Sequence, residues 1–108
     1  MQIDWNPVIH ILDELSDGTH SFLELSYMVP NYDRVAFVAG LMFLAERELI
    51  EVSAGRGPYK PIPRSDWPTL LRRCFGAEHV EQQAMVNHSI DLSQRGGQVL
   101  NLLGIGHP

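Results

Sequence analysis

The sequence predicts a mainly α-helical protein with a small antiparallel β-hairpin, an α+β fold class. Several segments space their apolar residues as amphipathic helices do, and capping residues precede them. One long apolar segment, 31–48, passes directly into an apolar/acidic run, 49–54, that is typical of a short strand. A glycine-rich turn at 55–58 follows, and a second strand after it would complete the hairpin.

Two short helices are predicted before the long apolar segment. The first begins at Asn6-Pro7, because proline is favoured at the first helical position, and it ends at Asp17-Gly18. Ser21-Phe22-Leu23-Glu24 fits a capping box, which begins a second helix over 22–28. Thr19-His20, between these helices, is a candidate for a strand of one or two residues.

The second half of the chain predicts one edge strand and further helices. Residues 59–62 can return as a second strand, which must lie at a sheet edge because Pro61, and Pro63 directly after it, cannot donate to a ladder. A fourth helix is predicted over 65–76, and weaker patterns predict helices over 78–88 and 92–103. Gly96-Gly97 would cost the last helix about 1 kcal/mol per glycine.

The chain divides at residue 76 in this interpretation. We expect one domain over 1–76 and a C-terminal helical extension over 77–108, which serves dimerisation or covers the core. The 108 residues, 44% of them hydrophobic, are enough for one small core. No run approaches the ~18–20 apolar residues of a membrane span, so no membrane partner is expected. The single cysteine, Cys74, indicates a reducing, cytoplasmic compartment.

The order of elements resembles the winged-helix family, in which a β-hairpin wing follows a helix-turn-helix. The order is helix, short strand, helix, turn, helix, strand, glycine-rich turn, strand, and it covers about residues 7–64. Its most specific part is FLAERELIEVSAGRGPYKPI, which resembles the end of a recognition helix and the wing. The resemblance implies a winged helix-turn-helix with extra C-terminal helices. Glu48 departs from the pattern, because many winged helices end this helix with glycine, and the proline-rich returning strand departs too.

The resemblance also implies a protein that binds double-stranded DNA and regulates transcription. In this family the third helix lies in the major groove and the wing contacts phosphates or a flanking minor groove. Five basic residues and one acid lie over 56–73, a net charge of +4 that would suit phosphates, although the whole chain carries −5. A solvated surface without a partner is an equal interpretation of this cluster. The candidate nucleic-acid-binding residues are Asn31, Tyr32 and Arg34 at the start of the third helix, Arg56 and Lys60 in the wing, and Arg64.

The middle of the third helix does not suit base reading. At 100° per residue Leu41 and Leu44 lie on the side that the family buries, whereas Val38, Met42 and Phe43 lie toward the other side. These side chains offer no paired donors and acceptors to a base edge, and a helix that is apolar all round is generally buried. We expect the C-terminal helices or a second copy of the chain to cover them. The alternatives are a winged-helix protein–protein interaction module, with Val38, Met42 and Phe43 as its partner-binding residues, and a helix that reaches DNA only by its N-terminal tip.

Motifs for catalysis, cofactors or metals are absent from the sequence. The chain has five histidines but no Cys-x-x-Cys, His-Glu-x-x-His or acidic-loop motif. Gly55-x-Gly57 is a turn signal and not a phosphate-binding loop, because it does not lie within a strand–loop–helix unit. We therefore expect no enzyme, cofactor or metal, and a homodimer for which 92–103 is a candidate interface helix.

Overall fold

The structure is a computed structural model that describes residues 3–55, 58–76 and 82–104. It is mainly helical with a small antiparallel sheet, which confirms the α+β class. The helices of the described residues are α1 (Trp5–Leu15), α2 (Phe22–Ser26), α3 (Arg34–Glu46), α4 (Trp67–Phe75), α5 (Gln82–Val86) and α6 (Gln94–Leu103), with 3-10 turns η1 (Val29–Asn31) and η2 (Arg64–Asp66). The strands are β1 (His20–Ser21), β2 (Ile50–Ala54), β3 (Lys60–Pro61) and β4 (His88–Leu92).

Polar side chains cap α2 and α3. Ser21 Oγ accepts a hydrogen bond from the Glu24 N–H at 3.1 Å, and the Glu24 carboxylate accepts one from the Ser21 N–H at 3.1 Å, which confirms the predicted capping box. The Ser21 backbone donor lowers the pKa of Glu24, because it stabilises the charged carboxylate. Asp33 caps α3, its carboxylate accepting from the Ala36 N–H at 3.1 Å.

Residues 88–92 form a strand that the sequence did not predict, whereas α5 and α6 lie within the predicted helical ranges 78–88 and 92–103. β4 lies inside the sheet, whose order is β1-β4-β2-β3, and all neighbouring strands are antiparallel. Ile90 is buried and pairs with Val52 on one side and His20 on the other. These partners are distant in the sequence, and strand formation depends on packing against such neighbours, so the local pattern carried little signal.

The short returning strand lies where the sequence predicts it. β3 pairs with the end of β2 at the sheet edge, with Pro61 opposite Ser53 and Lys60 opposite Ala54. Gly55, in the turn after β2, has φ +94°, a conformation that glycine adopts without steric cost.

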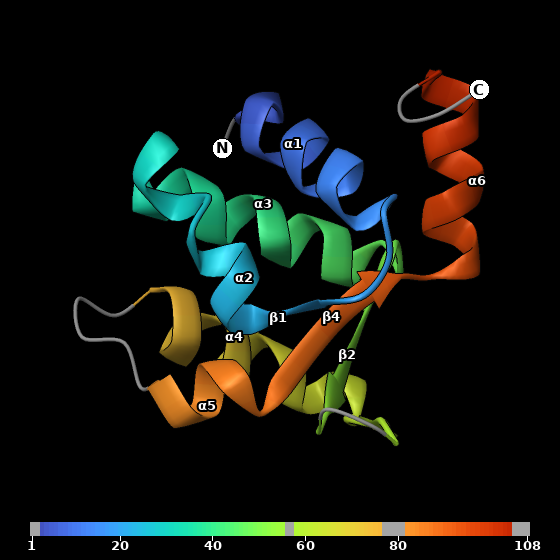
Figure 1. The fold of residues 1–108 in the computed structure, drawn as a ribbon. Helices are drawn as coiled ribbons and strands as arrows, with labels where there is room; N and C mark the ends of the chain where they lie inside the picture. The colour runs from blue at the N-terminus through green and yellow to red at the C-terminus, as the bar shows by residue number, and fades with distance from the viewer. Residues whose placement is uncertain (1–2, 56–57, 77–81, 105–108) are drawn as a thin grey trace.

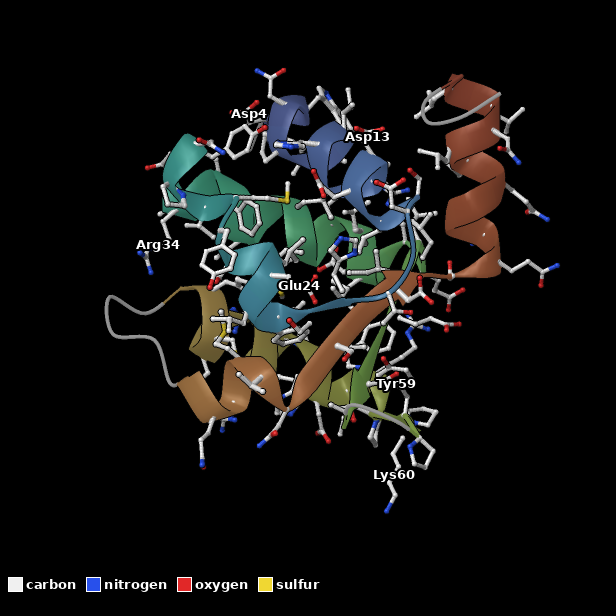
Figure 2. The ribbon with its side chains drawn as sticks, viewed as in Figure 1. Asp4, Asp13, Glu24, Arg34, Tyr59 and Lys60 are labelled. Carbon is white, nitrogen blue, oxygen red and sulfur yellow. The ribbon has the colours of Figure 1, made fainter. Side chains whose placement is uncertain are left out.

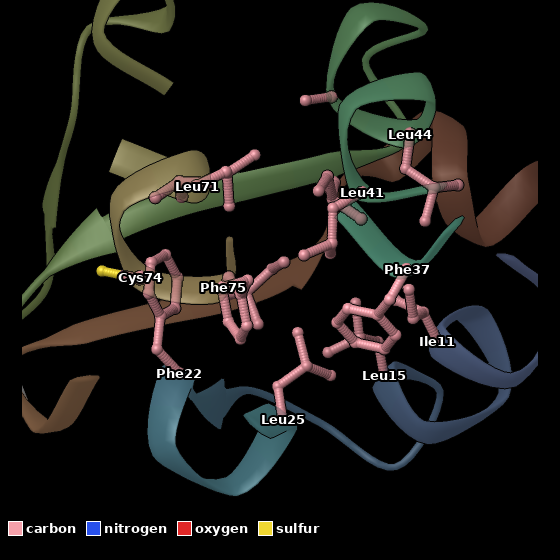
Figure 3. Packing of buried hydrophobic residues seen from close by; sticks show 14 of the residues in the cluster. Ile11, Leu15, Phe22, Leu25, Phe37, Leu41, Leu44, Leu71, Cys74 and Phe75 are labelled. Carbon is pink, nitrogen blue, oxygen red and sulfur yellow. The ribbon is translucent and has the colours of Figure 1, made fainter. Parts of the chain in front are cut away.

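One hydrophobic core joins the helices to the sheet (Figure 3). Phe22 of α2 and Phe37 of α3 both pack near Phe75 of α4, with ring centroids 5.1 Å and 5.9 Å from it. Ile90 of β4 and Leu100 of α6 belong to the same buried cluster. The segments 1–76 and 77–108 therefore contribute to one core.

The helix α6 stands at the edge of the molecule, on the far side from the start of α3 (Figure 1). It packs mainly against α1 and β4, and its first turn also meets Glu48 and Leu49. Leu100 is buried, whereas Leu102 is 86% exposed. None of the helices among the described residues combines the length and apolarity required to cross a membrane.

Candidate interaction groove on the third helix

The outward face of α3 forms the floor of an open groove of about 500 Å³. The start of the chain lies along one side, and the C-terminal end of α4 lies along the other. Most of the side chains in the floor are apolar, and Val35 is 66% exposed. The lining residues are Ile3, Arg34, Val35, Val38, Ala39, Met42, Phe43, Glu46, Arg72 and Gly76.

The packing of α1 against α3 explains why this face stays open. Phe37, Leu41 and Leu44 of α3 are completely buried, so one side of the helix is used by the core. Gly40 allows a close approach of α1, since a Cβ atom there would lie 3.2 Å from Val8 Cγ2. The apolar residues on the opposite side of α3 face away from the centre of the core, and they line the groove.

The three predicted partner-binding residues come together in this groove. Val38, Met42 and Phe43 are half-buried, because each packs against the core with part of its side chain. Trp5, which is 53% exposed, meets the Phe43 ring edge-on with centroids 5.2 Å apart. Coverage by the C-terminal helices is not observed: within the described part of the chain, neither α5 nor α6 lines the groove.

Charged residues are distributed unequally along the groove. Arg34 lines a second hollow together with Cys74 and Phe75, so the C-terminal end of α4 lies beside the start of α3. Arg72, one turn before Gly76 on α4, adds a second cation to the lining. Glu46 lines the opposite end, beside the start of α4.

The residues predicted at the tip of α3 have different environments. Asn31 is exposed, and Arg34 is half-buried on the rim of the groove. The Tyr32 hydroxyl lies 2.6 Å from His10 Nδ1, and its ring is near Phe37, with centroids 6.3 Å apart. The hydrogen bond and ring contact fix Tyr32 between α1 and α3, so it has a structural partner already.

The predicted wing residues lie elsewhere. Arg56 lies outside the described residues, and Lys60 is exposed on β3. Figure 2 shows Arg34 and Lys60 on opposite sides of the molecule. Arg64 forms an ion pair with Glu48, and the other carboxylate oxygen of Glu48 lies 3.9 Å from Arg95.

The basic residues of the 56–73 segment do not form one described surface. Arg64 faces Glu48, and Arg72 lines the α3 groove. Arg73 lines a separate hollow with His88 and Ile62. Clustering in the sequence therefore does not become clustering in space for these three residues.

Two histidines that lie on separate elements approach one carboxylate. His10 Nε2 is 3.7 Å and His20 Nε2 is 3.8 Å from oxygens of Glu14. Nevertheless, the described residues contain no group of three or more histidine, cysteine or acidic side chains arranged to hold a metal ion.

No family model, curated protein or solved structure matches this chain. The functional assignment therefore depends on its own residues. Sequence reasoning found Val38, Met42 and Phe43 through the helical period. It missed Ile3, Glu46 and Arg72 as groove residues, because the path of the N-terminal segment and the position of α4 set their places.

Proposed function

We propose that this protein is a winged-helix-type protein–protein interaction module, and that its α3 groove binds an apolar helical segment of a partner. The observation that carries the proposal is the open apolar face of α3. The succession α1, β1, α2, α3, β2, β3 supports the winged-helix description, with β4 as an added strand between β1 and β2. The same scaffold can carry different functions, so the site has to decide the assignment.

The chemistry of the groove favours a protein ligand over base edges. Burial of Val38, Met42 and Phe43 by a partner lowers the free energy of the complex, and this hydrophobic contribution does not depend on direction. Base recognition instead requires directed donors and acceptors. A helix can place anchors at positions i, i+3, i+4 and i+7 into such a groove. Methionine in the floor adapts to side chains of different shape.

Site-specific photo-crosslinking tests the proposal. A benzophenone amino acid replaces Met42 in the full chain, and a matched control carries it at Tyr59, which is exposed and does not line the groove. Irradiation in cells should give protein adducts from position 42 that are absent from position 59. A second substitution, Val38→Glu, should remove these adducts while circular dichroism shows a folded chain. Adducts to DNA alone, or none specific to position 42, would contradict the proposal.

A second candidate function is binding of duplex DNA through the β3 side of the molecule. The exposed Lys60 and the neighbouring Arg64 favour it, because both can reach phosphates from a sheet edge and the turn that follows. Fluorescence anisotropy with random duplex DNA at two salt concentrations tests this candidate. We expect the Lys60→Ala/Arg64→Ala variant to bind more weakly and with a smaller salt dependence. An unchanged salt dependence would remove these residues from the interface, and Arg34→Ala serves as the comparison for the helix tip.

A further inference from the structure

We infer that the α3 groove binds the α3 helix of a second copy of this chain, packed antiparallel across a two-fold axis. The inference rests on the proposed function of the groove as a protein-docking surface, and it names the partner. Its basis is the order of charged and apolar side chains along α3. When two α3 helices run antiparallel, apolar residues face apolar residues and the charge at one end faces the opposite charge at the other.

A two-fold interface requires that residue i of one copy contacts residue j of the other, and the reverse. In an antiparallel pair of helices centred on position 40, residues equally distant from this position face each other. Val38 then faces Met42 of the second copy, and Met42 faces Val38. Both side chains line the groove and are half-buried in the single chain. The apolar centre of the groove is therefore complementary to itself.

The charges at the two ends are complementary in the same arrangement. Arg34 faces Glu46 of the second copy, so the symmetry creates this pair twice. Arg72 of α4 adds a second positive charge to the lining of the groove. A parallel arrangement of the two helices would instead bring Arg34 near Arg34 and Glu46 near Glu46, and like charges at a contact are unfavourable. The charges thus select the antiparallel arrangement.

Two further charges flank the contact without forming a pair across it. The Asp33 carboxylate already accepts from the Ala36 N–H, and at 100° per residue Asp33 and Arg47 lie on the other side of α3 from the groove. The Arg47 guanidinium stays over the Phe43 ring, 5.1 Å from its centre. The net charge of −5 on each copy disfavours association at long range, so the two Arg34–Glu46 pairs have to orient the contact.

Small residues in the lining favour a close contact with a second helix. Gly76, at the end of α4, is one of these lining residues. Ala39 in the floor is small, which allows two helix axes to approach closely. The contact from Arg34 to Glu46 spans about 18 Å at 1.5 Å per residue, so it engages the whole length of α3.

Charge reversal provides the test. Sedimentation equilibrium over a range of concentrations compares the wild-type chain with Arg34→Glu, Glu46→Arg, the double variant, and an equimolar mixture of the single variants. We expect the wild type to dimerise and each single variant to dimerise about tenfold more weakly, because both copies of the pair become repulsive. The double variant and the mixture should recover dimerisation, since opposite charges face each other again. Recovery in the mixture also shows that both single variants fold.

Three outcomes would overturn the inference: a wild-type chain that stays monomeric, a wild-type dimer that the single variants leave intact, and a mixture that shows no recovery. Leu102→Gln on α6 is the matched control, because it removes an exposed leucine of the other candidate interface and should leave the dimer unchanged. A monomer whose position 42 crosslinks to a different protein would refute the inference and keep the proposed function. A monomer without such adducts would refute both.

Discussion

At the residue scale, Gly96 and Gly97 are neighbours in the first turn of α6 but have different surroundings. A Cβ atom on Gly96 would lie 1.9 Å from the Leu49 carbonyl oxygen, whereas nothing lies within 4 Å of one on Gly97. The helix starts beside the end of α3, where the Ser93 N–H also donates to the Leu49 carbonyl oxygen at 3.1 Å. Packing therefore requires glycine at position 96, whereas a side chain would fit at position 97.

Alanine substitutions separate these two glycines. We expect Gly96→Ala to lower the free energy of unfolding by about 1–3 kcal/mol, because backbone has to move to accommodate the methyl group. Gly97→Ala should raise it by about 0.5–1 kcal/mol through the higher helix propensity of alanine. Urea denaturation of both variants measures the two changes. Equal effects would mean that α6 does not pack against Leu49 as described.

Glu48 is the described non-glycine residue with a positive φ, at +61°. The residue lies directly after α3, where winged helices often carry glycine, so the departure noted in the sequence coincides with the left-handed conformation that glycine favours. The left-handed conformation costs other residues about 1–2 kcal/mol. In compensation, the Glu48 side chain joins Arg64 to Arg95, and the Glu48 carbonyl oxygen accepts a hydrogen bond from the Ser93 hydroxyl.

Two truncations of Glu48 separate the backbone term from the ion pairs. Both Glu48→Ala and Glu48→Gly remove the carboxylate, but only glycine relieves the strain at φ +61°. We expect the glycine variant to be more stable than the alanine variant by about 1 kcal/mol in thermal or urea unfolding. An alanine variant as stable as the glycine variant would contradict the left-handed assignment.

At the element scale, the capping box of α2 couples a short helix to pH. Helices of this length are marginal on their own, so the cap and the burial of Phe22 and Leu25 have to hold α2 in place. The Ser21 backbone N–H and hydroxyl both bind the Glu24 carboxylate. They bind the charged form, and for this reason folding lowers the pKa of Glu24.

Acidification should therefore weaken the cap in a defined direction. Because the pKa of Glu24 is lower in the folded state, its contribution is present above the ordinary value of 4.5 and is lost as the pH falls through the lower folded value. We expect Glu24→Gln to reduce the pH dependence of unfolding in this range, and Ser21→Ala to cost about 1 kcal/mol at neutral pH. Unfolding curves from about pH 3 to about pH 7, an interval in which carboxyl groups titrate, provide the measurement. A Glu24→Gln variant with the full wild-type slope would contradict this role.

At the scale of the whole molecule, local signals predicted what depends on neighbours in the sequence. The capping box at Ser21, the edge strand with Pro61, and the inner and outer faces of α3 all follow from such short-range rules. The strand β4 and the places of Arg72 and Ile3 depend on segments that lie far apart in the chain. A resemblance over residues 7–64 gave no information about the strand that 88–92 adds to the sheet.

Shortening the chain tests how much of the fold needs β4. A chain that ends at Gly76 lacks the strand between β1 and β2, as well as the buried Ile90 and Leu100. We expect it to show no cooperative unfolding transition by circular dichroism. A chain that ends at Ser93 keeps β4 and is the matched control, and it should fold with reduced stability because α6 is missing. Cooperative unfolding of the shorter chain would show that 1–76 folds by itself.

The pairing of β2 with β4 also affects the order of events during synthesis. Ile50 pairs with Leu92 and Ala54 with His88, so β2 leaves the ribosome well before its main partner. At about 5–20 residues per second the interval is about 2–8 s. During this interval Ile50 and Val52 lack the strand that covers them in the native sheet. The nascent chain therefore presents an apolar strand edge to chaperones, and completion of the sheet waits until residues 88–92 have been translated.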